Sequence, residues 1–322
     1  MKKSKYLFGP VPSRRFGRSL GVDLTAFKTC SLDCVFCQLG RTTHKTVERR
    51  EYVDIEEVLR ELQEWLRTDG EADYITLAGS GEPTLHERFD DIFALIKKKS
   101  DIPSLLLTNG TLLHLPEVRK AAALADVVKV SLSAWDQLSF GWVNRPHSEL
   151  RFTELVKGQK AFRSEYSGRL WMEIFLMSGI NTVPGDVEKI ARIAEEIRPD
   201  RIQFNTAVRP AAEDFVVPVS NERMADLSSL FHPQAEIIAD FSKQKDLNLK
   251  ANRESVLAML RRRPCTADQI ACGFGMHLNE VSKYLGSLLR AEEIRIEKTT
   301  GKVYYTASEK NPRMPPGGRE RR

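Results

Sequence analysis

Between residues 19 and 205 the chain alternates short apolar runs with longer amphipathic segments, and this alternation limits the possible folds more than any other feature. The apolar runs predict strands at residues 19–24, 74–78, 104–107, 127–132, 170–177 and 201–205. Helical patterns between them begin near Asp54, His86, Leu115, Ser148 and Pro184. Such repeated alternation is typical of a parallel βα array. By itself it fits either a doubly wound sheet or a partial barrel.

Three cysteines, Cys30, Cys34 and Cys37, follow the first predicted strand within eight residues and are three of only five in the chain. Their neighbours are mostly polar, so they do not follow the period of a buried helix or strand. Three thiolates can hold three irons of an iron-sulfur cube and leave the fourth iron open, where an electron-transfer cluster would use four. The spacing therefore predicts a metal site with an open position.

Zinc binding and disulfide formation are two other uses of closely spaced cysteines. A zinc knuckle would complete a tetrahedral Cys3His set with His44. A disulfide is not expected, because the sequence shows no secretory signal and its cysteine usage is typical of the cytosol.

The motif C-x3-C-x2-C, with Phe36 just before the last cysteine, resembles the cluster signature of the radical S-adenosylmethionine (SAM) superfamily. The stretch GPVPSRRFGRSLGVD at residues 9–23, followed by Lys28-Thr-Cys and Gln38-Leu-Gly-Arg-Thr, narrows the resemblance. It points to a poorly characterised Fe-S oxidoreductase group, distantly related to the wybutosine-synthesis enzymes that modify tRNA. The resemblance implies an α/β fold with a partial (β/α)6 TIM-like barrel. It also implies a 4Fe-4S cluster on the three cysteines, with SAM at the open iron.

Polar residues follow the later predicted strands, where a barrel gathers its reactive groups. Gly81 and Glu82 follow the second strand in the run AGSGEPT, where glycine lets the backbone approach a ligand and the carboxylate can accept from an ammonium. The resemblance assigns this segment to the amino group of SAM and assigns Ser133, after the fourth strand, to ribose or carboxylate. The candidate cofactor contacts are Gly81, Glu82, Asn109, Ser133, Asn205 and Phe36. Turns and helix caps use the same residue types.

A few further residues have two interpretations each, and no catalytic residue is assigned. Glu173 is a charge in an apolar strand, so it either faces the cavity or lies on a solvated face. His147 is either an acid-base group or a structural histidine at a helix start. Arg14, Arg15 and Arg18 either bind phosphate or carboxylate or are solvated surface charges.

The net charge of +5 is unevenly distributed. Lys and Arg number 11 against 3 acidic residues in residues 1–50, 24 against 33 in residues 51–250, and 14 against 8 in residues 251–322. The two basic segments would attract an anionic partner such as RNA. No apolar run approaches the roughly twenty residues of a membrane helix, so no membrane partner is expected and the cytoplasm is the predicted location.

The domain prediction places a radical SAM barrel at residues 1–210 and a helical connector at residues 211–250. Residues 251–306 combine helices at 254–262, 267–271 and 279–290 with a hairpin at 294–305, a pattern typical of a winged helix-turn-helix, a small α+β domain. A disordered basic tail is predicted at residues 307–322.

Two functions remain open at this point. The first is a radical SAM enzyme that cleaves SAM reductively and abstracts hydrogen from a large or anionic substrate, either RNA such as tRNA or a polypeptide, docked by the winged helix. Such an enzyme needs an external electron donor of flavodoxin or ferredoxin type. The alternative is an iron-sulfur-dependent regulator that binds DNA through the winged helix. The sequence does not indicate the oligomeric state.

Overall fold

An eight-stranded sheet with the order β1-β2-β5-β6-β7-β8-β9-β10 organises the first of two compact units, residues 1–247 and 248–322. The structure is a computed structural model and describes residues 4–13, 16–68, 70–238, 252–299 and 301–308. The strands are β1 (Leu7–Ser13), β2 (Gly17–Val22), β5 (Tyr74–Leu77), β6 (Ser104–Leu107), β7 (Val127–Ser131), β8 (Arg169–Leu176), β9 (Arg201–Thr206) and β10 (Glu236–Ile237).

The strands from β2 to β10 pair in parallel, and β1 pairs with β2 in the antiparallel sense. The six strands predicted from the sequence are β2 and β5 to β9, and each begins and ends within two residues of its predicted limits. The predicted parallel βα array is thus confirmed. The sheet is larger than predicted, because β1 and β10 extend its two edges.

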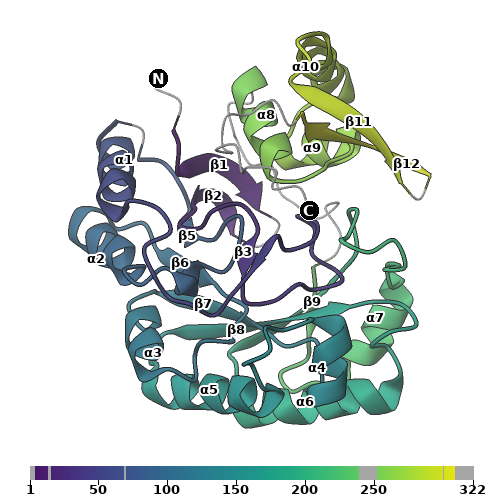
Figure 1. Ribbon diagram of the computed structural model, residues 1–322. Helices are drawn as coiled ribbons and strands as arrows, with labels where there is room; N and C mark the ends of the chain where they lie inside the picture. Colours follow the sequence, from purple (N-terminus) through teal and green to yellow (C-terminus); the bar gives the residue numbers. More distant parts are fainter. Residues whose placement is uncertain (1–3, 14–15, 69, 239–251, 300, 309–322) are drawn as a thin grey trace, which may run out of the picture. The chain divides into compact units, whose positions relative to one another are not determined.

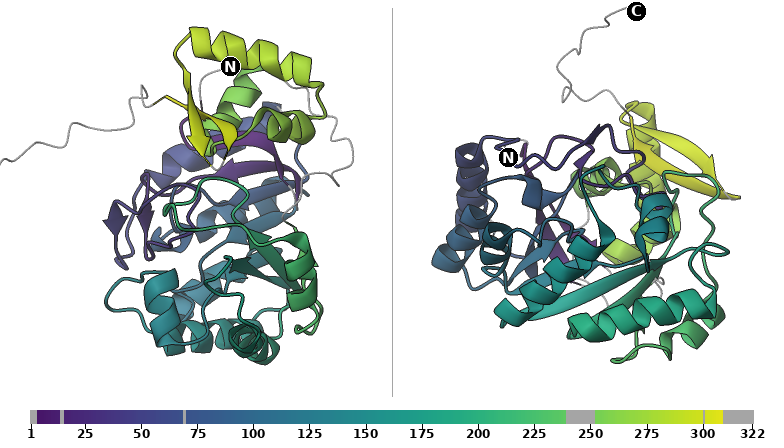
Figure 2. Two further views of the ribbon diagram at one scale, coloured as in Figure 1. Left: turned by 90° about the vertical axis from the view of Figure 1, so that its right-hand side faces the viewer. Right: turned by 60° about the horizontal axis from the view of Figure 1, so that its bottom comes forward.

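Helices lie along the convex side of the curved sheet (Figure 1). They are α1 (Ile55–Thr68), α2 (Asp90–Lys99), α3 (Pro116–Ala122), α4 (Gln137–Val143), α5 (Phe152–Glu165), α6 (Pro184–Ile197) and α7 (Asn221–Ser228). Their apolar residues pack with one face of the strands in the main core, for example Val58, Ile92, Ile190 and Met172. Figure 2 shows α5 and α6 beside the sheet from two further directions. The opposite, inner face of the strands is left for the candidate site.

Two helix starts differ from the prediction. The helix expected near His86 begins at Asp90, after a short 3-10 turn, η1 (Pro83–Leu85). The helix expected near Ser148 begins at Phe152, and α4 precedes it. Asp136 caps α4 by accepting from the main-chain N–H of Ser139, and the Ser139 side chain bonds back, which is a capping box.

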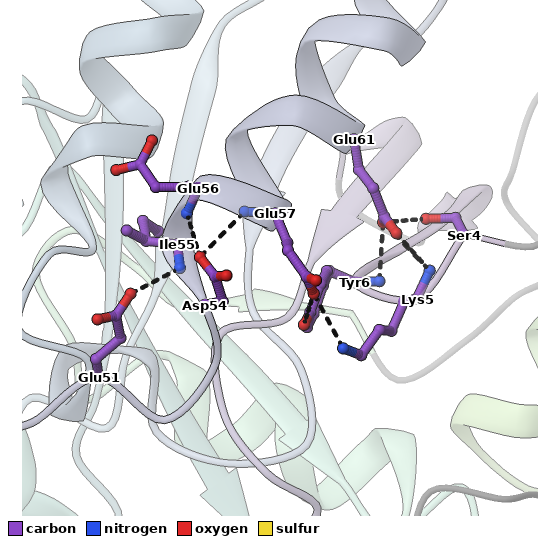
Figure 3. Close-up of polar contacts among 9 residues, drawn as sticks. All are labelled: Ser4, Lys5, Tyr6, Glu51, Asp54, Ile55, Glu56, Glu57 and Glu61. Atoms are coloured by element: carbon purple, nitrogen blue, oxygen red, sulfur yellow. Dashed lines mark hydrogen bonds and ion pairs between the residues drawn. The ribbon is translucent and has the colours of Figure 1, made fainter.

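Residues 4–6, which lead directly into β1, are held against α1 by carboxylates of that helix (Figure 3). Glu61 accepts from the Ser4 hydroxyl at 2.6 Å and from the Tyr6 main-chain N–H at 3.0 Å. Glu57 accepts from the Tyr6 hydroxyl at 2.7 Å. Asp54 accepts from main-chain N–H groups in the first turn of α1 and so fixes where the helix begins. These bonds attach the edge strand to the barrel wall.

The described part of the second unit consists of three helices and an antiparallel hairpin. The elements are α8 (Arg253–Arg262), α9 (Ala267–Phe274), α10 (Leu278–Arg290), β11 (Ile294–Thr299) and β12 (Lys302–Ala307). Cys265 exchanges two main-chain hydrogen bonds with Tyr305, at 3.0 and 2.8 Å, and its side chain is buried in this unit's core. Apolar residues of α8, α9, α10 and β11 form a hydrophobic core separate from that of the first unit, as is typical of a distinct domain.

Residues 211–250 contain α7 and β10, and residues 239–251 lie outside the described part, as does most of the predicted tail. Across the described ranges, none of the helices combines the length and the apolar character needed to span a bilayer.

Candidate functional site

The cysteine loop, defined as residues 24–46, connects β2 to the segment before α1 and is fixed by main-chain hydrogen bonds. Within it, β3 (Thr29–Cys30) pairs in parallel with β4 (His44–Lys45). The Lys28 N–H donates to the carbonyl of Ser80 at 2.8 Å, and the Thr46 N–H donates to the carbonyl of Cys30 at 3.0 Å. The loop therefore closes on itself and is attached to the segment that follows β5.

Each of the three cysteine sulfurs has its own nitrogen donor. Lys28 Nζ lies 3.0 Å from Cys37 Sγ, and Asn144 Nδ2 lies 3.3 Å from Cys34 Sγ. Asn109 Nδ2 lies 3.6 Å from Cys30 Sγ. Hydrogen bonds to ligand sulfurs orient the ligands and tune a bound cluster. Three thiols, each with one donor, fit a cluster held through three of its irons.

Removal of water by the surrounding chain raises the pKa of the Cys30 thiol to about 12, and the Glu82 carboxylate adds to that shift. Burial also raises the pKa of Cys34, with Cys30 and Cys37 contributing. A thiol must lose its proton before it can hold a metal, so iron binding at this loop is accompanied by proton release.

His44 does not join the cysteines. It pairs in register with Thr29, whereas Cys30 pairs with Lys45, and successive residues of a strand point to opposite faces. The His44 ring instead lies edge-on to Tyr52, with 6.3 Å between ring centroids. Nowhere in the described residues are three His, Cys, Asp or Glu side chains grouped to hold a single metal ion. The Cys3His arrangement is not the one observed.

Residues 79–81, which follow β5, are held by Asp23 at the end of β2. The Ser80 hydroxyl donates to the Asp23 carboxylate at 2.6 Å, and the Ser80 main-chain N–H donates to it at 3.1 Å. A Cβ added to Gly81 would lie 1.7 Å from the carbonyl oxygen of Thr29. Only glycine allows this close approach. The predicted cofactor segment thus packs directly against the cysteine loop.

Glu82 is buried and joins the segments that follow β5 and β6. Its Oε1 accepts from the hydroxyls of Thr84 and Thr108, both at 2.6 Å. Its Oε2 accepts from the main-chain N–H of Asn109 at 2.7 Å. Burial raises the pKa of this carboxyl, and the hydrogen bonds from Thr108, Thr84 and Asn109 oppose that rise. Glu82 therefore positions Asn109, whose side chain reaches Cys30.

Phe36 and Ser133 meet at Phe175, at the end of β8. The rings of Phe36 and Phe175 stack with centroids 4.4 Å apart and an angle of 12° between their planes. The Phe175 main-chain N–H donates to the Ser133 hydroxyl at 3.0 Å. Asn205 is buried at the end of β9, where its Oδ1 accepts from the N–H of Thr206 at 3.0 Å. The predicted contacts therefore lie at the carboxyl ends of several parallel strands, as expected for such a barrel.

Residues 143–147 form a brace along the cysteine loop, which the sequence did not reveal. The Val35 N–H donates to the carbonyl of Val143 at 3.0 Å, and the His147 N–H donates to the carbonyl of Ser31 at 2.9 Å. Asn144, on the same brace, is the donor to Cys34. Within this segment the sequence pointed only to His147, and it indicated no sulfur contact for Asn144 or Lys28.

Lys129 and Glu173 form an ion pair on the inner face of the sheet, with 2.6 Å between Lys129 Nζ and Glu173 Oε2. Their side chains are 5% and 17% exposed. Along β8, Glu173 lies between Trp171 and Phe175, which belong to two separate apolar clusters. The neighbouring Gln203 is buried, and its Oε1 has no hydrogen-bond partner among the described residues. Glu173 thus lies on the inner side of the barrel and not on a solvated face.

We expect Glu173→Leu to lower the free energy of unfolding by about 3–5 kcal/mol, because it leaves the Lys129 ammonium buried without its carboxylate. The double change Lys129→Met with Glu173→Leu should recover most of that loss. Urea unfolding of the wild type, the single variant and the double variant measures the loss of stability and its recovery. A double variant as unstable as the single one would show that the lost interaction is not the ion pair.

The radical SAM superfamily model matches residues 24–194 of this chain. The chain belongs to the radical SAM superfamily. The matched segment begins at the cysteine loop and includes β5 to β8 with the residues that follow them, whereas β2 and β9, which carries Asn205, lie outside it. The chain is therefore a radical SAM enzyme, and the superfamily uses a 4Fe-4S cluster and SAM.

Several curated proteins are similar over most of this radical SAM chain. The UPF0026 protein of Methanocaldococcus jannaschii is 30% identical over 82% of this chain and 84% of its own length. A UPF0026 protein of Helicobacter pylori strain 26695 is 31% identical over 94% of this chain and 97% of its own length. GTPase Obg of Brachyspira hyodysenteriae is 34% identical over 95% of this chain, but the chain spans only 46% of that protein.

Two solved structures share the fold of this radical SAM chain. TYW1 with a lysine-pyruvate adduct matches with a TM-score of 0.51 and 16% identity, over 71% of this chain and 76% of that chain. A radical SAM methyltransferase from Sphaerobacter thermophilus matches with a TM-score of 0.53 and 18% identity, over 68% of this chain and 66% of that chain. At these identities the likeness concerns the fold alone.

Proposed function

We propose that Cys30, Cys34 and Cys37 hold a 4Fe-4S cluster whose fourth iron binds SAM. The single observation that carries this proposal is the arrangement of the three sulfurs, each with its own nitrogen donor, in one anchored loop. Three thiolates leave one iron for a ligand other than the protein. A cluster held by these cysteines would supply the one-electron chemistry for reductive cleavage of SAM, which leads to hydrogen abstraction from a substrate.

The chain's own residues bind and orient SAM in this proposal. Gly81 keeps the segment after β5 close to the cysteine loop, and Glu82 and Asn109 fix its conformation. Ser133 and Asn205, at the strand ends, and Phe36, in the cysteine loop, line the rest of the site. A bound SAM that is held beside the loop by several strand-end residues is confined to one orientation, which favours a single reaction.

The substrate is a large or anionic molecule, RNA or a polypeptide, and the second unit docks it. Supporting this are the basic balance of residues 251–322, with 14 Lys and Arg against 8 acidic residues, and a separate core of three helices and a hairpin. Three helices followed by a hairpin are the elements of a winged helix-turn-helix. An external flavodoxin or ferredoxin supplies the electron. The DNA-binding regulator alternative is not favoured, because the matched family is one of enzymes.

A variant that ends at residue 250 tests the division of labour. We expect it to keep reductive SAM cleavage, because every proposed cluster and SAM contact lies within residues 28–205, and to lose binding of total tRNA or of unfolded polypeptide. SAM cleavage is followed by release of 5′-deoxyadenosine, and binding by fluorescence anisotropy with each labelled probe. Unchanged binding of both probes would contradict a docking role for the second unit.

A further inference from the structure

Lys28 lies directly before the first residue of β3 and is buried, with only 3% of its surface exposed. Its backbone has a φ of 56°, in the left-handed region that a non-glycine residue seldom adopts. Main-chain bonds hold it there: its N–H donates to Ser80, and its carbonyl accepts from Thr43 at 3.2 Å and from His44 at 3.1 Å. The anchored backbone fixes the direction of the side chain.

The Lys28 side chain is directed at a sulfur rather than at a carboxylate. Its Nζ lies 3.0 Å from Cys37 Sγ, and within the described residues it makes no ion pair with Asp or Glu. Cys30 and Cys34 receive their hydrogen bonds from neutral side-chain amides. A buried ammonium requires a compensating negative charge. With a cluster bound, the Cys37 ligand, 3.0 Å from Lys28 Nζ, would supply that negative charge.

We propose that Lys28 sets the reduction potential of the cluster by holding a buried positive charge against the Cys37 ligand, an inference that rests on the proposed function. Accepting one electron from an external donor makes the centre more negative by one charge. A nearby positive charge in a dry environment stabilises that reduced state more than the oxidised one. Hydrogen bonds and net charge around the sulfurs are recognised determinants of cluster potential. Lys28 therefore makes the centre easier to reduce.

Reductive titration of the reconstituted full-length protein, followed by electron paramagnetic resonance, tests this role. Lys28→Met removes the charge and the donor, whereas Lys28→Gln removes the charge and keeps a donor. At a fixed applied potential we expect the ratio of reduced to oxidised cluster to fall about tenfold in both variants. For a one-electron step, this change corresponds to a reduction potential that is lower by about 59 mV. Lys28→Arg, which keeps the charge, should remain close to the wild-type value.

Lys45→Met is the matched control, because it removes the same charge from the same loop. Lys45 pairs in register with Cys30, but its side chain is exposed and its ammonium donates to the carbonyl of Arg145 at 3.2 Å. Water screens an exposed charge, so the reduction potential of the cluster in Lys45→Met should equal that of the wild type.

Iron content is measured first, so that the two proposals can fail separately. A wild-type protein that binds no 4Fe-4S cluster would refute the proposed cysteine site itself. Clusters of normal iron content with wild-type potentials in Lys28→Met and Lys28→Gln would overturn the role of Lys28 alone. An equal shift in Lys45→Met would also overturn it, since the effect would then be one of general charge. If Lys28→Met does not retain iron, the comparison of Lys28→Gln with Lys28→Arg decides.

Discussion

Changing Cys30, Cys34 or Cys37 to alanine is expected to remove the bound iron and with it all reductive cleavage of SAM. Each thiolate holds a different iron of the cube, so two remaining ligands do not retain an intact 4Fe-4S centre. Alanine is the suitable replacement because, unlike serine, it offers no oxygen that could replace the sulfur. Anaerobic reconstitution followed by iron analysis and measurement of 5′-deoxyadenosine gives the result for each variant.

Cys272→Ala is the control for these three changes. Cys272 lies on α9 in the second unit and is only partly buried, so its loss should leave both iron content and SAM cleavage at wild-type values. A loop variant that retains full iron content and activity would remove that cysteine from the ligand set.

Gly81→Ala is expected to have the second largest effect, because the new Cβ would meet main-chain atoms that cannot move away. The added carbon would lie 1.7 Å from the carbonyl oxygen of Thr29 and 2.9 Å from Thr25 Oγ1. The segment after β5 must therefore separate from the cysteine loop. We expect the free energy of unfolding to fall by about 3 kcal/mol. We also expect SAM affinity to fall about tenfold or more, a loss of about 1.4 kcal/mol in binding. Urea unfolding and equilibrium SAM binding measure the two quantities.

Gly185→Ala is the matched control for this change. Gly185 lies in the first turn of α6, and a Cβ there meets no atom within 4 Å. Alanine in a helix is favoured over glycine by about 0.5–1 kcal/mol, so this variant should be as stable as the wild type or more so. If Gly81→Ala matched Gly185→Ala in both measurements, the close packing at Thr29 would not be needed for SAM binding.

The six buried strands could be predicted from the sequence because parallel strands covered by helices are short, continuous apolar runs. Strand β1 could not, because Pro10 and Pro12 lie within it and proline is typical of an edge strand or of no strand at all. Helix α4 is only seven residues long, too short to show a clear helical period, and its start is marked by the Asp136 capping box.

At the site, the positions of the cysteines and of Glu82 after the ends of parallel strands could be predicted because each stands in a compact motif, and their roles as ligands and SAM contacts stay predictions. The sulfur contacts of Asn144 and Lys28 could not be predicted. Asn144 is 110 residues away from Cys34 along the chain, so only the fold brings them together. Lys28 is close in sequence to Cys37, but its side chain reaches the sulfur from a backbone with positive φ. A lysine in a polar loop gives no indication of that backbone conformation.

The most direct test of the account is anaerobic reconstitution of the full-length protein with iron and sulfide, followed by dithionite and SAM. The account predicts about three to four irons per chain, since an open-site cluster needs only three protein ligands, together with release of 5′-deoxyadenosine. Bound zinc, or a reduced iron-sulfur cluster that leaves SAM intact, would contradict it.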